Sequence, residues 1–521
     1  MMLGLHLDLK WSMYRRRFLR EIVRHMSTLG MDTILLEFEN KIPLDPFQAV
    51  VHPDAWSREE LKAFLRDCRA HRIQVIPKIP LMGHMEWLLQ WPWWADMQEN
   101  SDRREICPSH PRTAGVVARL LDQVLRLFPD APFVHLGGDE SFSLGTCPRC
   151  RKTGKPKGQL YLDHYLPLFR QAQKAGKRPL IYGDMILAHP EIIHELPRSV
   201  VIADWDYWSG TGPGRNVWGY QEINSAEDVR RFPKQFWRFR NYFIQKDGSL
   251  APFPYAVFLK DQGFDVILMP SARCMGDNFC APQTAIHVRN TRAAGQKAVE
   301  LGLKGMIVTS WAVRFNHFQT NWPSIAAGAW SYHEPHLTLE QIGERFARRF
   351  WGLDCSELFE FLDLLSPALP DLHAGRADPY PPDIVHEYIR SLYKDPNSES
   401  CLFVERNLAP IKKSFNLAWK QLNRLAVNVR WNRRIFDHWL LAAETLQHKA
   451  QMLPAVLQSA HDRKISSRCR NNILVEIDKL ADQYEVVFGR TMPRTSLDME
   501  RRLRFAEVKK LVASMDERTF V

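Results

Sequence analysis

Two adjacent acids, Asp139 and Glu140, end an apolar stretch that reads FVHLGG from Phe133. The glycines before them, Gly137 and Gly138, allow the backbone to turn tightly. Just past a strand end the alternation of side chains is relaxed, so both acids can face one cleft. Two converging carboxylates repel each other, which can keep one protonated near neutral pH as a general acid. The pattern therefore predicts acid–base chemistry at this turn.

Polar and aromatic side chains stand at the ends of other apolar stretches. They are His6, Asp8, Glu37, Glu39, His84, Tyr182, Asp184, Trp205, Asp206, Tyr207, Trp208 and Trp311. Carboxylates can bind sugar hydroxyls, and flat rings can stack on the C–H face of a pyranose. Any single Trp is more often core or interface, because the chain has 17 of them. Together, however, these residues favour a carbohydrate site.

Eight short runs rich in β-branched and aliphatic residues predict strands buried on both faces. They begin at Leu3, Thr33, Ile73, Phe133, Arg178, Ser199, Phe264 and Gly305. Amphipathic stretches at 15–29, 57–72, 113–128 and 284–301 predict helices between them. Ser57 and Glu60 form a capping box at the start of the second.

Eight strands, each followed by helix-forming sequence, predict an α/β fold, a (β/α)8 TIM barrel over residues 1–335. A doubly wound open sheet is the alternative, but the count of eight and the lack of a Gly-rich phosphate fingerprint favour the barrel. Residues 209–248 predict an insertion near the barrel mouth, the end where catalytic groups lie in such barrels. Helical periodicity dominates residues 336–521, which predicts an α-helical C-terminal domain.

Composition excludes several classes of protein. The 521 residues are 45% hydrophobic and 25% charged, which is typical of a globular chain and not of a disordered or disulfide-stapled one. We find no apolar run of 18 residues and no secretory signal, so we expect no membrane partner. Nine scattered cysteines, an odd number, favour a reducing compartment, and we expect a cytoplasmic location.

The net charge of +11 is concentrated near the C-terminus. Residues 401–521 hold 22 Lys and Arg against 13 Asp and Glu. The basic residues are scattered through helical sequence, without a Gly-Arg tract or zinc-finger spacing. This favours a solvated helix face, and we expect no nucleic-acid partner.

The string HLGGDE at 135–140 resembles the catalytic signature of glycoside hydrolase family 20, the β-N-acetylhexosaminidases. The resemblance is greatest to the hexosaminidase D-like branch and runs across most of residues 3–330. Similar blocks occur in the same order, namely HLDLK from His6, ILLEFEN from Ile34, GHMEW from Gly83, WDY from Trp205, TSW ending at Trp311 and RFNHF from Arg314.

This resemblance implies an exo-acting retaining enzyme that removes terminal β-linked GlcNAc or GalNAc. The sugar's own 2-acetamido oxygen would attack C1 and form an oxazolinium, with no cofactor. Glu140 would protonate the leaving oxygen and then act as base toward water. Asp139 would orient the acetamido N–H, and Tyr207 would bind the acetamido oxygen. Trp311 would form a wall of the pocket, with His84 and His135 as orienting residues.

Two contacts common in the family are missing. The run GLHLDLK from Gly4 has no Arg to grip sugar hydroxyls, and Ala312 follows Trp311 where an acid is usual. We expect Asp8, Glu39, Asp184 or Arg314 to replace these contacts, with Trp205 also against the sugar. Two alternatives stay open: the same mechanism on another 2-acetamido sugar (sulfated GlcNAc or a released disaccharide), and a non-catalytic carbohydrate-binding barrel.

Cys147-Pro-Arg-Cys150 has the spacing of a metal knuckle or a redox pair, and Cys274 and Cys280 form a second pair. Four thiolates could hold zinc, but the strands before the two pairs are not neighbours in a barrel. We therefore expect inert loop thiols and no metal. The expected partner is a glycan or amino-sugar substrate, and the C-terminal helices are candidates for self-association.

Overall fold

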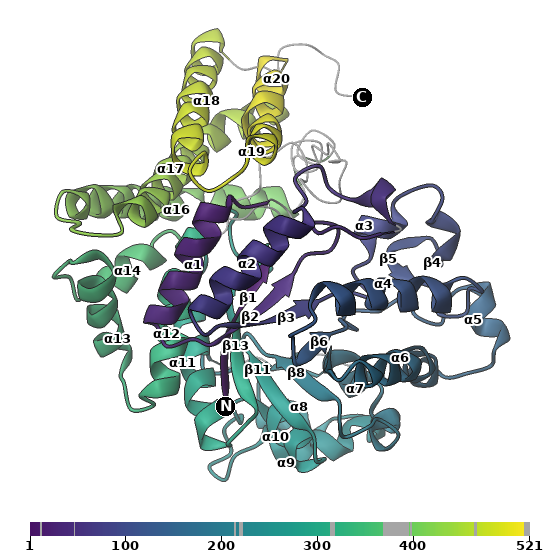
Figure 1. Cartoon of the computed structure of the whole chain (residues 1–521). Helices are drawn as coiled ribbons and strands as arrows, with labels where there is room; N and C mark the ends of the chain where they lie inside the picture. The colour runs from purple at the N-terminus through teal and green to yellow at the C-terminus, as the bar shows by residue number, and fades with distance from the viewer. Residues whose placement is uncertain are drawn as a thin grey trace.

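Eight parallel strands close into a barrel in the computed structural model (Figure 1). They are β1 (Met2–Asp8), β2 (Thr33–Glu37), β3 (Gln74–Lys78), β6 (Phe133–His135), β7 (Arg178–Tyr182), β8 (Val201–Trp205), β11 (Asp265–Met269) and β13 (Gly305–Ser310). Each pairs with the next, and β1 pairs with β13. The predicted eight-stranded barrel is confirmed. The structure describes residues 1–10, 13–45, 47–212, 215–217, 222–312, 318–367, 395, 397, 399–462 and 466–514.

The register of the strands builds a polar layer near the carboxyl end of the barrel. Asp8 pairs with Glu37, Glu37 with Lys78, and Lys78 with His135. Residues paired in this way lie side by side across four neighbouring strands, and all four are buried. The end of the barrel above this layer is the mouth, where the loops after the strands converge.

Helices with apolar inner faces surround the strands. They are α1 (Arg16–Thr28), α2 (Arg58–Ala70), α4 (Thr113–Leu127), α6 (Lys157–Lys174), α7 (Asp184–Ala188), α10 (Pro254–Asp261), α11 (Thr284–Glu300) and α12 (Trp322–His333). The four predicted helical stretches are confirmed to within two residues at either end. The predicted capping box is also present, since Ser57 accepts from the backbone of Glu60 and Glu60 accepts from that of Ser57.

The loops at the mouth carry short elements of their own. After β3 come α3 (Glu86–Leu89), η2 (Ala95–Met97), β4 (Gln98–Glu99) and β5 (Asp102–Ile106), and β4 pairs with β5 in an antiparallel hairpin. The loop after β6 contains α5 (Pro148–Lys152). The predicted insertion contains β9 (Arg215–Asn216), β10 (Glu222–Ile223), α8 (Ala226–Arg230), η4 (Lys234–Phe239) and α9 (Arg240–Phe243). The remaining short elements are η1 (Gln48–Val50), η3 (Pro190–His194), η5 (Phe318–Asn321) and β12 (Ser271–Arg273).

The described residues beyond 335 form helices and no strands. These helices are α13 (Leu339–Phe346), η6 (Ala347–Trp351), α14 (Leu358–Asp363), α16 (Glu399–Ala426), α17 (Arg433–Asp462), α18 (Ser467–Phe488), α19 (Arg494–Arg501), η7 (Arg502–Ala506) and α20 (Glu507–Ala513). A turn at 427–432 separates α16 from α17, and in it Trp431 and Asn432 donate to the carbonyls of Arg349 and Phe350. Among the described helices, none is long and apolar enough to cross a membrane.

The C-terminal helices contact the mouth side of the barrel through the segment after β1. The backbone N–H of Arg15 donates to Thr491 O at 2.6 Å, and Arg15 Nε donates to Met492 O at 2.7 Å. The backbone N–H of Met13 donates to Ser496 Oγ at 3.3 Å. Figure 1 shows α18, α19 and α20 gathered at the end of the molecule opposite the N-terminus. The division into domains at residue 335 stays a prediction.

Candidate active site

A tight turn after β6 carries Asp139 and Glu140 into the barrel mouth. Gly137 and Gly138 have φ angles of 70° and 94°, which glycine adopts at little cost. Tyr161 donates its hydroxyl to Gly138 O at 3.0 Å, and a Cβ at Gly138 would collide with that hydroxyl. The glycines are therefore required both by the backbone angles and by the close approach of Tyr161.

His84 lies between the two acids. Its Nε2 is 3.4 Å from Asp139 Oδ2 and 3.3 Å from Glu140 Oε2. The Asp139 side chain is 6% exposed and that of Glu140 is 41% exposed. His84 and Glu140 both adopt positive φ angles, 55° and 49°, which are uncommon for residues other than glycine and frequent at functional sites. One acid is thus buried against the imidazole while the other reaches solvent.

The charges of this group are coupled. Burial alone would lower the pKa of His84, but Asp139 and Glu140 outweigh it and hold that pKa well above its usual range. Burial alone would raise the pKa of Asp139, but the His84 cation and Lys78 hold it at about 2. Asp139 is therefore ionised. Its Oδ1 atom is buried, and none of the described residues hydrogen-bonds to it.

Asp184, at the start of α7, holds the backbone of Glu140. Its Oδ2 accepts a hydrogen bond of 2.8 Å from the N–H of Glu140. Burial, followed by the charge of Asp139, raises the pKa of Asp184 well above its usual range. The raised pKa favours the neutral form of Asp184, which limits the negative charge beside the two acids. This hydrogen bond holds the backbone of Glu140 in its positive-φ conformation.

Two aromatic residues that follow β8 and β13, strands separated in the barrel only by β11, meet at the mouth. Trp311, which follows β13, donates its indole N–H to Tyr207 Oη at 2.7 Å. Trp205 stacks on Tyr207 with ring centres 5.3 Å apart and an interplanar angle of 24°. An indole is only a donor, so the hydroxyl of Tyr207 accepts here and keeps its own hydrogen. No acceptor for that hydrogen is found among the described residues.

A buried ion pair lies beneath the acids. Lys78 Nζ is 2.5 Å from Glu37 Oε1, and His6 Nε2 is 2.8 Å from Glu37 Oε2. Lys78 Nζ also lies 5.4 Å from the centre of the Trp311 ring. Burial alone would lower the pKa of Lys78, but Glu37 and Asp139 raise it above its usual value. Lys78 was absent from the predicted site, although a lysine inside an apolar strand signals a buried charge pair.

The other predicted residues surround this group. Asp8 accepts from the backbone N–H of Lys10 at 2.8 Å and from that of Ala312 at 2.9 Å, which joins β1 to the segment after β13. Glu39 Oε1 lies 3.3 Å from Lys10 Nζ. His135 accepts from the N–H of Gly137, and burial, followed by Lys78, lowers its pKa to about 3. Arg314 lies outside the described residues.

The two cysteine pairs do not form one site. Cys147 and Cys150 lie in a buried group with Cys107 and Glu99, whereas Cys274 lies in a separate group with Asp277 and His287. Cys280 is buried and belongs to neither group. The first group contains a third cysteine that the spacing of the two pairs did not indicate.

Comparison with known proteins finds a family match for the segment that contains the two acids. The model of the "Glycosyl hydrolase family 20, catalytic domain" matches residues 25–249, which include Asp139, Glu140 and Tyr207. Hexosaminidase D of Homo sapiens is 29% identical over 334 residues, covering 62% of this chain and 62% of that protein. Hexosaminidase D of Bos taurus is 29% identical over 213 residues, covering 39% of this chain and 62% of that protein.

The alignments span less than two thirds of the length of either hexosaminidase D. Among solved structures, a β-N-acetylhexosaminidase from Bacteroides fragilis is 18% identical with a TM-score of 0.45, covering 63% of this chain and 64% of that one. Residues 25–249 therefore match the catalytic domain of glycosyl hydrolase family 20, and the chain is similar to the hexosaminidase D proteins.

Proposed function

We propose that this chain is a glycoside hydrolase, an exo-acting retaining β-N-acetylhexosaminidase that releases terminal β-linked GlcNAc or GalNAc. One observation carries the proposal. An ionised, buried Asp139 with an uncommitted oxygen lies beside a half-exposed Glu140, and His84 contacts both. The first acid can bind a group within the barrel mouth while the second exchanges protons with a leaving group and with water.

The proposed reaction is assisted by the substrate. Glu140 donates its proton to the glycosidic oxygen as the bond from C1 to that oxygen breaks. The 2-acetamido oxygen forms a bond to C1 and gives an oxazolinium ion. Glu140 then takes a proton from a water molecule, whose oxygen attacks C1 as the bond from C1 to the acetamido oxygen breaks. This step restores both the acetamido group and the original configuration at C1. This route uses no protein nucleophile, so the usual rule for the spacing of two carboxylates does not apply.

Asp139 and Tyr207 are proposed to hold the acetamido group. Asp139 Oδ1 would accept the acetamido N–H, and its negative charge would stabilise the positive charge that develops on the ring. The Tyr207 hydroxyl has its hydrogen available because Trp311 donates to it, so it can donate to the acetamido oxygen. Trp311 and Trp205 would enclose the sugar with flat apolar faces.

A panel of substrates tests the activity and separates the alternatives. We expect purified protein to hydrolyse the 4-nitrophenyl glycosides of β-GlcNAc, β-GalNAc, or both. Preference for the 6-sulfo-GlcNAc glycoside would indicate a sulfated substrate, and release of an intact disaccharide from its aryl glycoside would indicate a disaccharide-releasing enzyme. Binding of GlcNAc without hydrolysis of any substrate would favour the non-catalytic barrel.

A thiazoline mimic of the oxazolinium should inhibit the enzyme far more strongly than free GlcNAc. The fused ring places its atoms where Asp139 and Tyr207 would bind the intermediate. Transition-state and intermediate analogues bind about 10²-fold or more tightly than substrates. Inhibition constants measured for the thiazoline and for GlcNAc check this. Equal affinity for both compounds would contradict the substrate-assisted mechanism.

His84→Gln should move the acidic limb of the pH profile to higher pH. The His84 cation opposes the effect of burial on Asp139 and holds its pKa at about 2. Without that cation burial dominates, the pKa of Asp139 rises, and the ionised form is lost at a higher pH. The measurement is kcat/KM against pH, over the range in which circular dichroism shows both proteins folded. His71→Gln, on the exposed end of α2, is the control, and an unshifted limb in His84→Gln would contradict the coupling.

Self-association through the C-terminal helices and a cytoplasmic location stay predictions. The positive charge of this region is partly balanced in the structure, since Lys509 lies on Asp478 and Arg494 lies on Glu485 and Asp498. These pairs support a solvated helix face. Light scattering of the purified chain measures its oligomeric state directly.

A further inference from the structure

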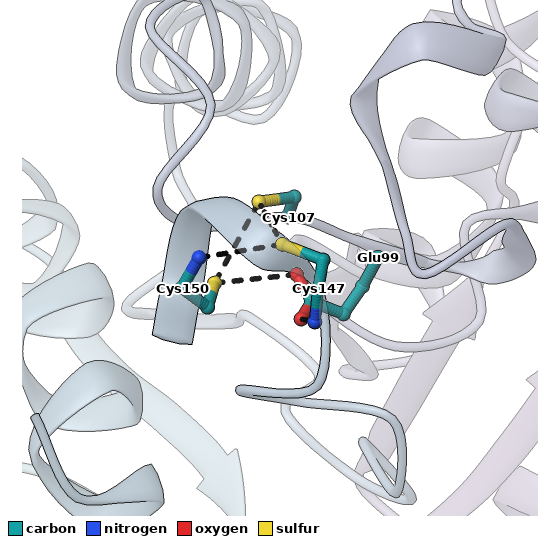
Figure 2. Close-up of side chains that lie close together, drawn as sticks. All are labelled: Glu99, Cys107, Cys147 and Cys150. Atoms are coloured by element: carbon teal, nitrogen blue, oxygen red, sulfur yellow. Dashed lines mark hydrogen bonds between the residues drawn. The ribbon is translucent and has the colours of Figure 1, made fainter. Parts of the chain in front are cut away.

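Three cysteines and one glutamate converge in a buried group beside the acid loop (Figure 2). Glu99 comes from β4, Cys107 follows β5, and Cys147 and Cys150 lie at α5, in the loop that begins with Asp139. All four are buried, and one donor atom from each lies within 4.8 Å of the other three. Figure 2 shows the three sulfur atoms and the carboxylate facing one another.

The spacing of the donor atoms fits a tetrahedral metal site. Cys107 Sγ is 3.4 Å from Cys147 Sγ and 3.7 Å from Cys150 Sγ, and Cys150 Sγ is 3.3 Å from Glu99 Oε2. Zinc–sulfur bonds of about 2.3 Å at tetrahedral angles place two sulfurs about 3.8 Å apart, and a sulfur and an oxygen about 3.5 Å apart. A disulfide would need about 2.0 Å. The group therefore has the dimensions of a coordination shell.

The buried carboxylate of Glu99 also favours a bound cation. The side chain of Glu99 accepts from the N–H of Cys147 at 2.7 Å and contacts Cys150 Sγ. No Lys, Arg or His of the described part of the chain forms an ion pair with it. A buried carboxylate is costly unless it is paired or coordinates a metal. A divalent cation at the centre of the group would supply that positive charge.

We propose that Glu99, Cys107, Cys147 and Cys150 bind one structural zinc ion. Thiolate-rich tetrahedral sites select zinc among the common divalent metals. Four protein ligands in a buried position leave no coordination position open, which is the property of a structural site. Binding releases the thiol protons of the three cysteines. Nearby groups orient the ligands: the N–H of Cys150 donates to Cys147 Sγ, and Ser109 Oγ lies 3.2 Å from Cys150 Sγ.

The zinc would fasten together the two loops that supply the acid pair and its histidine. The β4–β5 hairpin belongs to the segment after β3, which also contains His84. The backbone N–H of Met85, beside His84, donates to Arg104 O in β5 at 2.9 Å. The backbone N–H of Ser143 donates to Glu105 Oε1 at 2.8 Å. This positioning role rests on the proposed function, whereas the metal site does not.

Metal content of the full-length protein tests the site. Purified from zinc-supplemented medium, the wild type should contain one zinc per chain by mass spectrometry of the metal. Cys107→Ser and Cys150→Ser should each fall to about a tenth of an equivalent or less, because a coordinating thiolate is lost. Cys68→Ala, which removes a buried thiol of α2 outside the group, should keep one equivalent.

If a cysteine variant does not fold, cobalt substitution of the wild-type protein tests the site instead. Wild-type protein exchanged with Co²⁺ should show thiolate-to-cobalt charge-transfer bands and the strong visible bands of tetrahedral cobalt. Glu99→Gln keeps the three thiolates, so it should retain the charge-transfer bands while losing Co²⁺ at a lower chelator concentration. Removal of zinc should lower the melting temperature, and added zinc should restore it.

Two results would overturn the zinc site. One is metal-free protein in which peptide mass spectrometry finds a disulfide that joins two of the three cysteines Cys107, Cys147 and Cys150. The other is bound cobalt without charge-transfer bands. None of these readouts uses hydrolysis, so a zinc-containing but inactive protein would refute the proposed function and leave the metal site standing. Metal-depleted protein that is folded and fully active would overturn the positioning role alone.

Discussion

Glu140→Gln should lower kcat/KM for natural glycosides by about 10²- to 10⁴-fold, the usual contribution of general acid catalysis. A dinitrophenyl glycoside should keep much more of its rate. Its leaving group departs without a proton, so the loss of the acid matters less. Glu140 is the more exposed of the two acids, 41% against 6% for Asp139, which is the position a group must have to reach the glycosidic oxygen and then water.

The measurement is kcat/KM for wild type and Glu140→Gln across aryl glycosides of graded leaving-group acidity. We expect the variant to depend far more steeply on the leaving group than the wild type does. Glu59→Gln, on the exposed first turn of α2, is the control for removing a surface carboxylate. A uniform loss across the series would mean that Glu140 is not the general acid.

Asp139→Asn should slow good and poor leaving groups alike. A preorganised group that stabilises developing charge contributes about 10²- to 10³-fold, and well-oriented intramolecular attack can lower a barrier by about 7–11 kcal/mol. Both contributions depend on the position and charge of Asp139, whatever leaving group departs. In the variant an uncharged amide would face His84, Lys78 and the developing oxazolinium.

The same series of aryl glycosides checks this expectation, with kcat/KM falling by a similar factor for each compound. Melting temperatures of wild type and variant show whether the fold is kept. If good leaving groups rescued Asp139→Asn and did not rescue Glu140→Gln, the two roles would be reversed. If neither variant lost activity, the catalytic site would lie elsewhere.

The barrel was predictable because its strands lie in apolar runs that recur eight times with helix-forming sequence between them. The layer of Asp8, Glu37, Lys78 and His135 was not, because it depends on the register between strands that only the closed barrel fixes. Asp139 and Glu140 were identifiable from a signature of six residues. Their contact with His84 depends on two loops whose backbones adopt positive φ angles. No sequence pattern indicates that these two loops meet.

The cysteine group shows the same limit. Cys147 and Cys150 attract attention because only two residues separate them. Cys107 comes 40 residues earlier, after a hairpin whose strands, QE and DRREI, are mostly polar and form no apolar run. The sequence does not distinguish Glu99 from other acidic residues, because only the folded hairpin places it beside the sulfur atoms. The roles of the site residues and the domain boundary stay predictions.

The hydrogen bonds from Arg15 to Thr491 and Met492 bear on how the chain folds during synthesis. They join residues 476 and 477 positions apart, and the barrel cannot close until β13 is available to pair with β1. At about 5–20 residues per second, roughly 25–95 s separate the translation of Arg15 from that of its partner. A nascent chain therefore lacks these partners of the segment after β1 until Thr491 and Met492 have been translated. Ribosome-bound chains stopped before α19 should bind chaperones for longer than chains stopped after it.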